Sequence, residues 1–198
     1  SISFIEIFSL IKLIIMYFNS ERDIKLSIKW RLKNMNKLID LSYVKEEQEK
    51  FSKHLQTVKG IKPQINILKV SEKQILHLQS ELFEVLNEIK LHKDYDNEID
   101  RNRVIEELSD CLSIIGNIAN SIGVELIIEN EIKEIDNPIK LFRNLIYDIS
   151  RMDKTAKVGE SRRKLKYLIV PQFVDFVYSC GFNLSELKEA YFIKMSKN

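Results

Sequence analysis

Two pairs of carboxylates, each spaced by three residues, are the groups in this chain with the clearest potential for chemistry. Glu81 and Glu84 form the first pair, and Glu107 and Asp110 form the second. Residues three apart lie on one side of an α-helix, so each pair can act together if its segment is helical. Carboxylates from two helices repel one another unless a cation lies between them, and magnesium binds a few carboxylates together with substrate phosphates. The two pairs therefore predict a magnesium site that handles phosphates.

The hydrophobic pattern around the first pair predicts an amphipathic helix over about 71–90. Its Ser-Glu-Lys-Gln start at Ser71 has the form of a capping box, which is typical of a helix N-terminus. At about 100° per residue, Glu81, Glu84 and Glu88 project into a sector of roughly 60° beside the apolar stripe. The three carboxylates are therefore expected next to the core and not on the far, solvated side of the helix.

A second amphipathic helix is expected over about 101–121. Glu107 projects inside its wide apolar face, and Asp110 lies at the edge of that face. An ionised carboxylate without a partner is costly on a core face, so Glu107 should be paired, protonated or metal-bound. The polar stretch over 92–100 reads as a loop, and an antiparallel hairpin of the two helices can bring the carboxylates face to face.

Few residues interrupt the helix-compatible stretches, because the 198-residue chain has only 5 Gly and 3 Pro. This composition predicts an all-α fold, and the length fits one domain. The first eighteen residues are apolar, but Glu6 and Lys12 interrupt them, and the run is shorter than the roughly 20 apolar residues of a membrane helix. We therefore expect a native domain over 35–198 that begins at Met35, and an N-terminal extension over 1–34 outside it.

Elsewhere in the chain, apolar patterns predict four more helices, and a cluster of Lys and Arg residues marks a basic segment. The basic segment over 151–166 is expected to be partly loop around Gly159. Two interpretations stay open for it: a solvated basic loop, or a segment that closes over a bound phosphate ligand through Arg162 and Arg163. The further helices are expected over about 35–56, 138–149, 171–180 and from 183 or 185 to the chain end.

Charge and cysteine usage limit the partners and the compartment. Charged residues make up 30% of the chain but leave a net charge of only +2, so no global field indicates a nucleic-acid partner. Cys111 and Cys180 lie among apolar helical residues, which predicts buried free thiols in a reducing cytosol. Neither has a second cysteine or a histidine at ligand spacing, so a zinc site is not supported. We expect a cytoplasmic protein with no nucleic-acid and no membrane partner.

The order Glu81-xx-Glu84 and then Glu107-xx-Asp110 resembles the signature of the all-α nucleoside-triphosphate pyrophosphatases, the MazG-like and dimeric dUTPase superfamily. The contexts Glu-Leu-Phe-Glu-Val-Leu-Asn-Glu and Glu-Glu-Leu-Ser-Asp-Cys-Leu-Ser look most like those of the dimeric dUTPases. The resemblance spans about 35–198, and only the two acidic motifs are specific. It implies a MazG-like helical bundle, with antiparallel helices that carry the acidic site, and a homodimer.

The resemblance also implies a reaction and its cofactor. A nucleoside triphosphate, with dUTP favoured, would be split into the monophosphate and pyrophosphate in the presence of Mg²⁺. By resemblance, Glu84 would in addition orient the attacking water as general base, and Glu88 is a candidate further ligand. The four residues that would hold the magnesium are Glu81, Glu84, Glu107 and Asp110.

Outside the acidic motifs the resemblance is carried by single residues. Family members have a Tyr-xx-Lys-Asn-xx-Asn-xx-Arg-Gln run near the C-terminus. Its tyrosine, lysine and second asparagine match Tyr191, Lys194 and Asn198, whereas Met195 replaces its first asparagine. By resemblance, Lys194 and Asn198 would contact phosphate or sugar, and Gln48 would contact the base. The chain stops before the expected arginine, which implies a C-terminally truncated sequence.

Two other functions stay open at this point. The first is a MazG-like pyrophosphatase that acts on another nucleotide. The second is a non-catalytic helical interaction protein that has kept the acidic residues of the family. Magnesium-dependent release of pyrophosphate from a panel of nucleotides separates the three functions.

Overall fold

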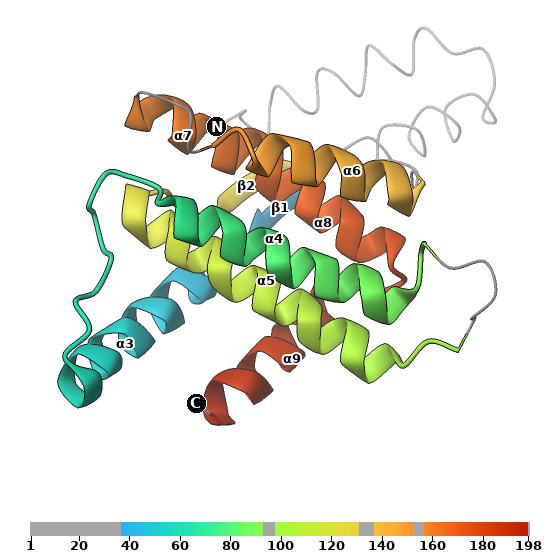
Figure 1. Cartoon of the computed structure of the whole chain (residues 1–198), viewed down its shortest axis with the longest axis horizontal. Helices are drawn as coiled ribbons and strands as arrows, with labels where there is room; N and C mark the ends of the chain where they lie inside the picture. Colours follow the sequence, from blue (N-terminus) through green and yellow to red (C-terminus); the bar gives the residue numbers. More distant parts are fainter. Residues whose placement is uncertain (1–36, 93–97, 131–136, 153–156, 198) are drawn as a thin grey trace, which may run out of the picture. The chain divides into compact units, whose positions relative to one another are not determined.

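The computed structural model describes residues 37–92, 98–130, 137–152 and 157–197. Apart from Lys37, all of them belong to one compact unit, Leu38–Asn198. The expected extension over 1–34 lies outside the described residues. The elements, labelled as in Figure 1, are β1 (Lys37–Asp40), α3 (Ser42–Lys59), α4 (Glu72–Ile89), α5 (Arg101–Ile122), β2 (Ile127–Asn130), α6 (Pro138–Ile149), α7 (Val158–Lys164), the π-helical turn η1 (Leu165–Ile169), α8 (Val170–Ser179) and α9 (Leu184–Lys197).

Helix α5 is the central element of this unit. It packs against α3, α4, α7 and α9, and α4 also packs against α6. Figure 1 shows α4 and α5 side by side, with α6 to α8 on one side of the pair and α3 and α9 on the other. The two central helices are antiparallel, since Gln74 near the start of α4 donates a hydrogen bond of 2.7 Å to Ser121 near the end of α5. The expected all-α bundle with antiparallel helices is confirmed.

Helix α4 begins at the predicted capping box. The Ser71 hydroxyl accepts from the backbone N–H of Gln74, and the Gln74 side chain accepts from the backbone N–H of Ser71. Two backbone donors at the helix start are thereby satisfied. The apolar stripe that faces the core consists of Ile75, Leu78, Leu82, Val85 and Ile89, all of which are buried.

Local signals also set the ends of the other helices. Asp100 caps α5 through the backbone N–H groups of its first turn, and Gly123, with φ of +64°, ends it in the left-handed conformation that glycine adopts without strain. Asn137 caps α6 and Asn183 caps α9 in the same way as Asp100. The boundaries predicted for these helices are confirmed.

The prediction of a helix over about 35–56 is wrong at its start. Residues 37–40 form the strand β1, which pairs with β2, and α3 begins only at Ser42. Leu38 is exposed whereas Ile39 is buried, so the side chains alternate as in a strand. Periodicity cannot separate a four-residue strand from a helical turn, and the pairing partner is nearly ninety positions away in the chain.

The prediction of a loop around Gly159 is also wrong. Gly159 lies inside α7, which continues through η1 into α8. A glycine inside a helix costs only about 1 kcal/mol, and this segment buries Leu165, Ile169 and Val170 against the core. Pro171 follows the π-helical turn, whose wider spacing accommodates a residue without a backbone N–H.

Both cysteines are free and buried, as predicted. Burial raises the pKa of the Cys111 thiol well above its ordinary value and that of Cys180 to about 12. These thiols therefore behave as small apolar core groups. Within the described residues, none of the helices combines the length and the apolar character that crossing a membrane requires.

Candidate metal centre

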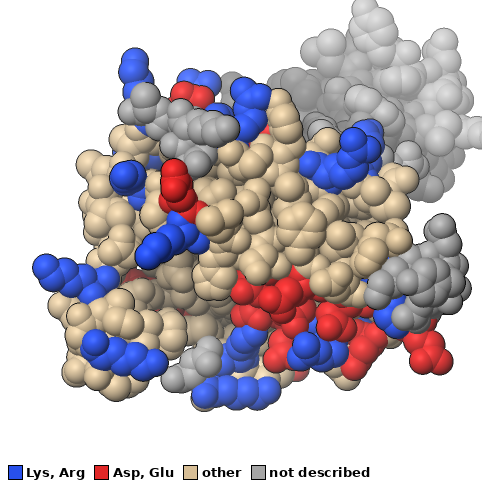
Figure 2. All heavy atoms as spheres, viewed as in Figure 1, with Lys and Arg blue, Asp and Glu red and all other residues tan. Residues whose placement is uncertain are grey.

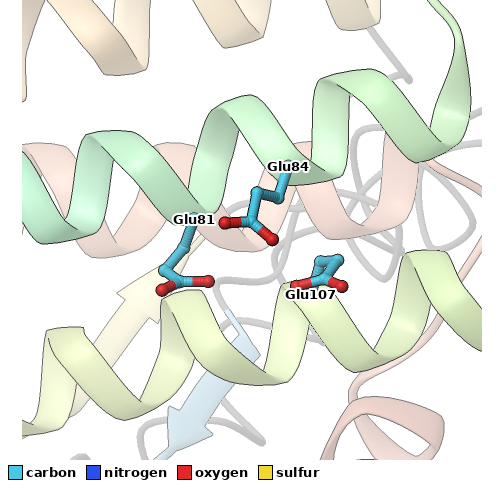
Figure 3. A group of neighbouring side chains, drawn as sticks. All are labelled: Glu81, Glu84 and Glu107. Atoms are coloured by element: carbon cyan, nitrogen blue, oxygen red, sulfur yellow. The ribbon is translucent and has the colours of Figure 1, made fainter.

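The antiparallel packing of α4 and α5 brings three glutamates together. Glu81, Glu84 and Glu107 each offer one carboxylate oxygen, and the three oxygens lie within 4.8 Å of one another. Figure 3 shows Glu81 and Glu84 reaching from α4 toward Glu107 on α5. Two glutamates of α4 and one of α5 thus form one acidic cluster, which we call the carboxylate cluster below.

The three members differ in exposure, and the difference suits a site that is open on one side. Glu107 keeps only 5% of its surface exposed, whereas Glu81 is partly buried and Glu84 is exposed. The position of Glu107 within the apolar face of α5 was predicted from the helical projection. The floor of the cluster is therefore buried in the bundle, and Glu84 lies on its solvent side.

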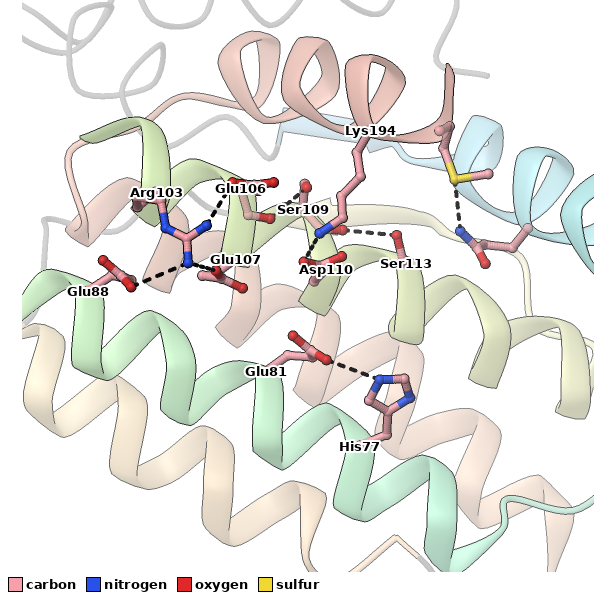
Figure 4. A network of polar contacts seen from close by, with 12 residues as sticks. His77, Glu81, Glu88, Arg103, Glu106, Glu107, Ser109, Asp110, Ser113 and Lys194 are labelled. Carbon is pink, nitrogen blue, oxygen red and sulfur yellow. Dashed lines mark hydrogen bonds and ion pairs between the residues drawn. The ribbon is translucent and has the colours of Figure 1, made fainter. Parts of the chain in front are cut away.

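Basic side chains partly neutralise the carboxylate cluster (Figure 4). Arg103 Nη2 lies 3.2 Å from Glu107 Oε1 and 3.7 Å from Glu88 Oε1, so it joins α5 to α4. His77 Nε2 lies 3.0 Å from Glu81 Oε1. The expectation that Glu107 needs a partner is met by Arg103, and Glu88 shares that partner at the edge of the cluster.

These contacts leave an excess of negative charge at the cluster. Burial, followed by the charges of Asp110 and Glu84, raises the pKa of both Glu81 and Glu107. His77 lowers the pKa of Glu81 and Arg103 lowers that of Glu107, but neither offsets the increase. A raised pKa means that the folded protein resists full ionisation of the cluster, and a bound divalent cation relieves that cost.

The charge of Asp110 raises the pKa of Glu81 and Glu107, so Asp110 lies near both. Its Oδ2 atom, however, is bonded to a side chain outside the cluster. Lys194 of α9 donates to Asp110 Oδ2, and both side chains are partly buried. The structure therefore places all four acids of the two sequence motifs in one region. Three of them meet, and the fourth is ion-paired with Lys194.

Figure 2 shows a dense group of Asp and Glu side chains on one face of the molecule, with Lys and Arg side chains next to it. The donor set of the carboxylate cluster is made of hard oxygen atoms, without cysteine, and oxygen ligands of this kind suit magnesium, calcium or manganese. The residues therefore fit the divalent cation that the sequence motifs indicate.

The other predicted contact residues lie around α9. Gln48 of α3 is buried, and its side-chain amide donates to Tyr191 Oη at 3.1 Å and to Met195 Sδ at 3.4 Å. Lys194 lies one turn after Tyr191 on the same helix and reaches Asp110. Asn198 lies outside the described residues.

Arg162 does not lie near the carboxylate cluster. Its Nε donates a hydrogen bond of 2.6 Å to the carbonyl oxygen of Ile122, at the C-terminus of α5. Ile122 is fifteen residues from Glu107, which corresponds to about 20 Å along the helix. Arg162 thus provides a hydrogen-bond donor for a terminal carbonyl of α5, and its positive charge lies at the negative end of the α5 dipole. It does not close over the acidic site.

Sequence reasoning missed Arg103 and His77 as neighbours of the cluster. Each is four residues before the glutamate that it contacts, Arg103 before Glu107 and His77 before Glu81. The i, i+4 spacing of opposite charges on a helix was therefore a usable signal. The contact between Lys194 and Asp110 had no such signal, because it joins residues that are 84 positions apart.

A comparison with protein-family models finds one match over most of the chain. The model is described as dUTPase and matches residues 40–198. The matched segment contains both acidic pairs, Gln48 and Lys194. No curated protein matches the chain.

Proposed function

Because the chain belongs to the dUTPase family, we propose that it hydrolyses dUTP to dUMP and pyrophosphate with Mg²⁺ as cofactor. The observation that carries this proposal is the convergence of three carboxylate oxygens from two helices within 4.8 Å, with Asp110 beside them. Such a donor set suits a hard cation that binds triphosphate oxygens. The proposed enzyme is a homodimer, as the resemblance of its motifs implies, and its two free buried cysteines support a cytoplasmic location.

The proposed cation ligands are the four acids of the two motifs. The bound magnesium would neutralise triphosphate charge and lower the pKa of a water molecule. Glu107 and Glu81 would form the buried side of the site, and Asp110 would join them after leaving Lys194. Glu88 is a candidate further ligand, which requires that it leave Arg103. In both cases the magnesium ion would replace a basic side chain, Lys194 or Arg103, as the partner of the carboxylate.

Glu84 is proposed as the general base. It is the most exposed member of the carboxylate cluster, so a water molecule and a substrate phosphate can approach it from solvent. Its carboxylate would orient that water for attack on phosphorus and accept its proton.

The remaining proposed roles concern the substrate. Lys194, once released from Asp110, would donate to a phosphate oxygen, and Asn198 would contact phosphate or sugar. Gln48 would contact the base, which requires that its amide exchange Tyr191 or Met195 for the ligand. The position of Lys194 next to Asp110 supports its assignment, because an ammonium group there lies beside the proposed cations.

A panel of deoxynucleoside and nucleoside triphosphates, assayed with magnesium for pyrophosphate release, tests the proposal. We expect release from dUTP, and a loss of at least about 100-fold in kcat for Glu84→Gln, which is the usual scale for removal of a general base. Glu106→Gln is the matched control, because Glu106 precedes Glu107 on α5 but lies outside the carboxylate cluster, is only partly buried and pairs with Arg103. No release from any triphosphate would contradict the proposal, and release from another nucleotide would change the substrate.

A further inference from the structure

We infer that His77 is a further metal ligand, which gives the carboxylate cluster an affinity for transition-metal cations such as Co²⁺ in addition to the proposed Mg²⁺. The inference rests on the proposed metal site and deepens it, because it adds a nitrogen donor to the oxygen donors of the two acidic motifs. The ligand atoms are His77 Nε2 and Glu81 Oε1, which lie 3.0 Å apart. Figure 4 shows the imidazole ring directed at the Glu81 carboxylate.

His77 and Arg103 lie at opposite ends of the carboxylate cluster. Along α4, His77 precedes Glu81, whereas Arg103 contacts Glu88, which is eleven residues after His77, and Glu107 of α5. Eleven residues correspond to about 16 Å along a helix. The contacts at the Arg103 end involve carboxylate oxygens, whereas the His77 end offers a cation both an oxygen and a nitrogen atom.

The spacing of the two ligand atoms suits a shared cation. In an octahedral coordination shell with bonds of about 2.1 Å, adjacent ligand atoms are about 3.0 Å apart. The observed separation of Nε2 and Oε1 is 3.0 Å, so both atoms can bind one cation with little change in their separation. Glu81 is itself one of the three glutamates whose oxygens meet within 4.8 Å, and it therefore links His77 to the rest of the cluster.

Helix α4 holds the two side chains in this relation. His77 and Glu81 are four residues apart, so they lie one turn apart on the same face of the helix. Helices bind zinc through side chains with this i, i+4 spacing. The helix itself is fixed by the capping box at Ser71 and by the buried Leu78 and Leu82. The backbone positions of both ligands are therefore set before a cation binds.

His77 differs chemically from the other basic side chains at the cluster. The ammonium group of Lys194 and the guanidinium group of Arg103 have no lone pair for a metal, so they can only leave when a cation binds. A neutral imidazole carries one proton, which can lie on either ring nitrogen, and the nitrogen without the proton binds metals. The side chain of His77 is 57% exposed, so water can bond the second nitrogen. His77 can therefore change from a hydrogen-bond partner of Glu81 into a metal ligand.

A nitrogen donor changes the relative affinities for different metals. Magnesium and calcium take oxygen ligands, whereas imidazole nitrogen suits zinc, nickel and other transition metals. The three glutamates can serve both kinds of cation. The contribution of His77 should therefore appear in the affinity for Co²⁺ and be nearly absent from the affinity for Mg²⁺. This difference separates a metal ligand from a residue that only orients Glu81.

Calorimetric titration of the metal-free, untagged protein at pH 8 with Co²⁺ and, separately, with Mg²⁺ tests the inference. His77→Gln keeps a side-chain N–H that can donate to Glu81 but removes the imidazole nitrogen. We expect it to weaken Co²⁺ binding about 10-fold or more and to change Mg²⁺ binding less than about 2-fold. His54→Gln is the matched control, since His54 is exposed on α3 and lies outside the carboxylate cluster, and it should change neither affinity.

Proton NMR of the Co²⁺-bound protein gives a readout that a purely structural role would not change. A histidine bound directly to Co²⁺ shows a strongly shifted ring N–H signal that disappears in D₂O. We expect this signal in wild type and in His54→Gln but not in His77→Gln. Lack of the signal in wild type, or its persistence in His77→Gln, would overturn the inference. An unchanged Co²⁺ affinity in His77→Gln, or an equal loss for both cations, would do the same.

Failure of the inference can be distinguished from failure of the proposed function. If wild-type protein releases no pyrophosphate from any triphosphate, the proposed reaction fails, yet the titrations still report on ligation by His77. If dUTP is hydrolysed with Mg²⁺ and His77→Gln binds Co²⁺ as wild type does, the reaction stands and the inference is wrong. Wild-type protein that binds neither cation overturns both.

Discussion

Lys194 of α9 and Asp110 of α5 form an ion pair beside the carboxylate cluster, so the chain itself supplies a cation to its acidic site (Figure 4). The ammonium group lowers the pKa of nearby Glu107, so its charge acts on the most buried member of the cluster. A divalent cation that binds Asp110 must displace this ammonium group. Cation binding and the position of the last turns of α9 are therefore linked.

Replacement of Lys194 by methionine should strengthen cation binding and weaken substrate binding. A partly exposed ion pair contributes about 1 kcal/mol or less, so loss of the competing charge should tighten Mg²⁺ binding about 2- to 5-fold in calorimetry. The KM for dUTP should increase, because the proposed phosphate contact is lost. Lys197→Met is the control, since Lys197 is exposed and forms no ion pair within the described residues. Weaker Mg²⁺ binding by Lys194→Met would contradict the linkage.

Magnesium should stabilise the protein through Glu107 but not through its neighbour Glu106. A ligand at about 100 times its dissociation constant stabilises the folded state by about 2.7 kcal/mol. We expect the melting temperatures of wild type and Glu106→Gln to rise with magnesium and to fall again with a chelator. Glu107→Gln should show little of this response, because it loses the most buried ligand. A full magnesium response in Glu107→Gln would place the cation elsewhere.

Without metal, the carboxylate cluster should make stability decrease as the pH rises. The pKa of Glu81 and Glu107 is raised above the ordinary value of 4.5, so the folded protein binds protons more tightly than the unfolded chain. The free energy of unfolding should therefore fall from about pH 4.5 upward, until the raised pKa values are passed. Urea denaturation in chelator measures this slope, and Glu107→Gln should reduce it. An equal slope in wild type and variant would count against the cluster as its source.

Two glycine substitutions should have opposite effects on stability. A Cβ atom at Gly116 would lie 2.6 Å from Val44 Cγ1 and 3.1 Å from Gln48 Cγ, where α3 crosses α5. Gly116→Ala should therefore destabilise the protein by about 1–3 kcal/mol. A Cβ atom at Gly159 meets nothing within 4 Å, so Gly159→Ala should add up to about 1 kcal/mol through helix propensity. Chemical denaturation gives both values, and a stabilising Gly116→Ala would show that the crossing can separate.

The helices and the carboxylate cluster could be predicted because their signals are local. The capping box at Ser71 and the apolar stripes define α4 and α5, and the 3.6-residue period places Glu107 on a core face. The short polar segment between the two helices allows them to pack as an antiparallel hairpin. A meeting of carboxylates from the two helices could therefore be expected from the sequence, and the structure brings three of them together.

The features that sequence reasoning missed depend on contacts between distant segments. Residues 37–40 form a strand that pairs with 127–130, and Gly159 lies in the first turn of a helical segment whose later residues, such as Leu165 and Ile169, are buried in the core. The ion pair of Lys194 with Asp110 and the engagement of Gln48 by Tyr191 both need α9 to return across α5. No local pattern encodes such a return.

The sequence by itself determined the chemistry of the site: four acids at helical spacing, on two adjacent helices, which require a cation or a partner. Only the tertiary structure decided how that requirement is met without metal, through Arg103, His77 and Lys194. The reason is physical. Spacing along a helix fixes which side chains share a face, whereas the partner that covers a face is set by the packing of all helices together.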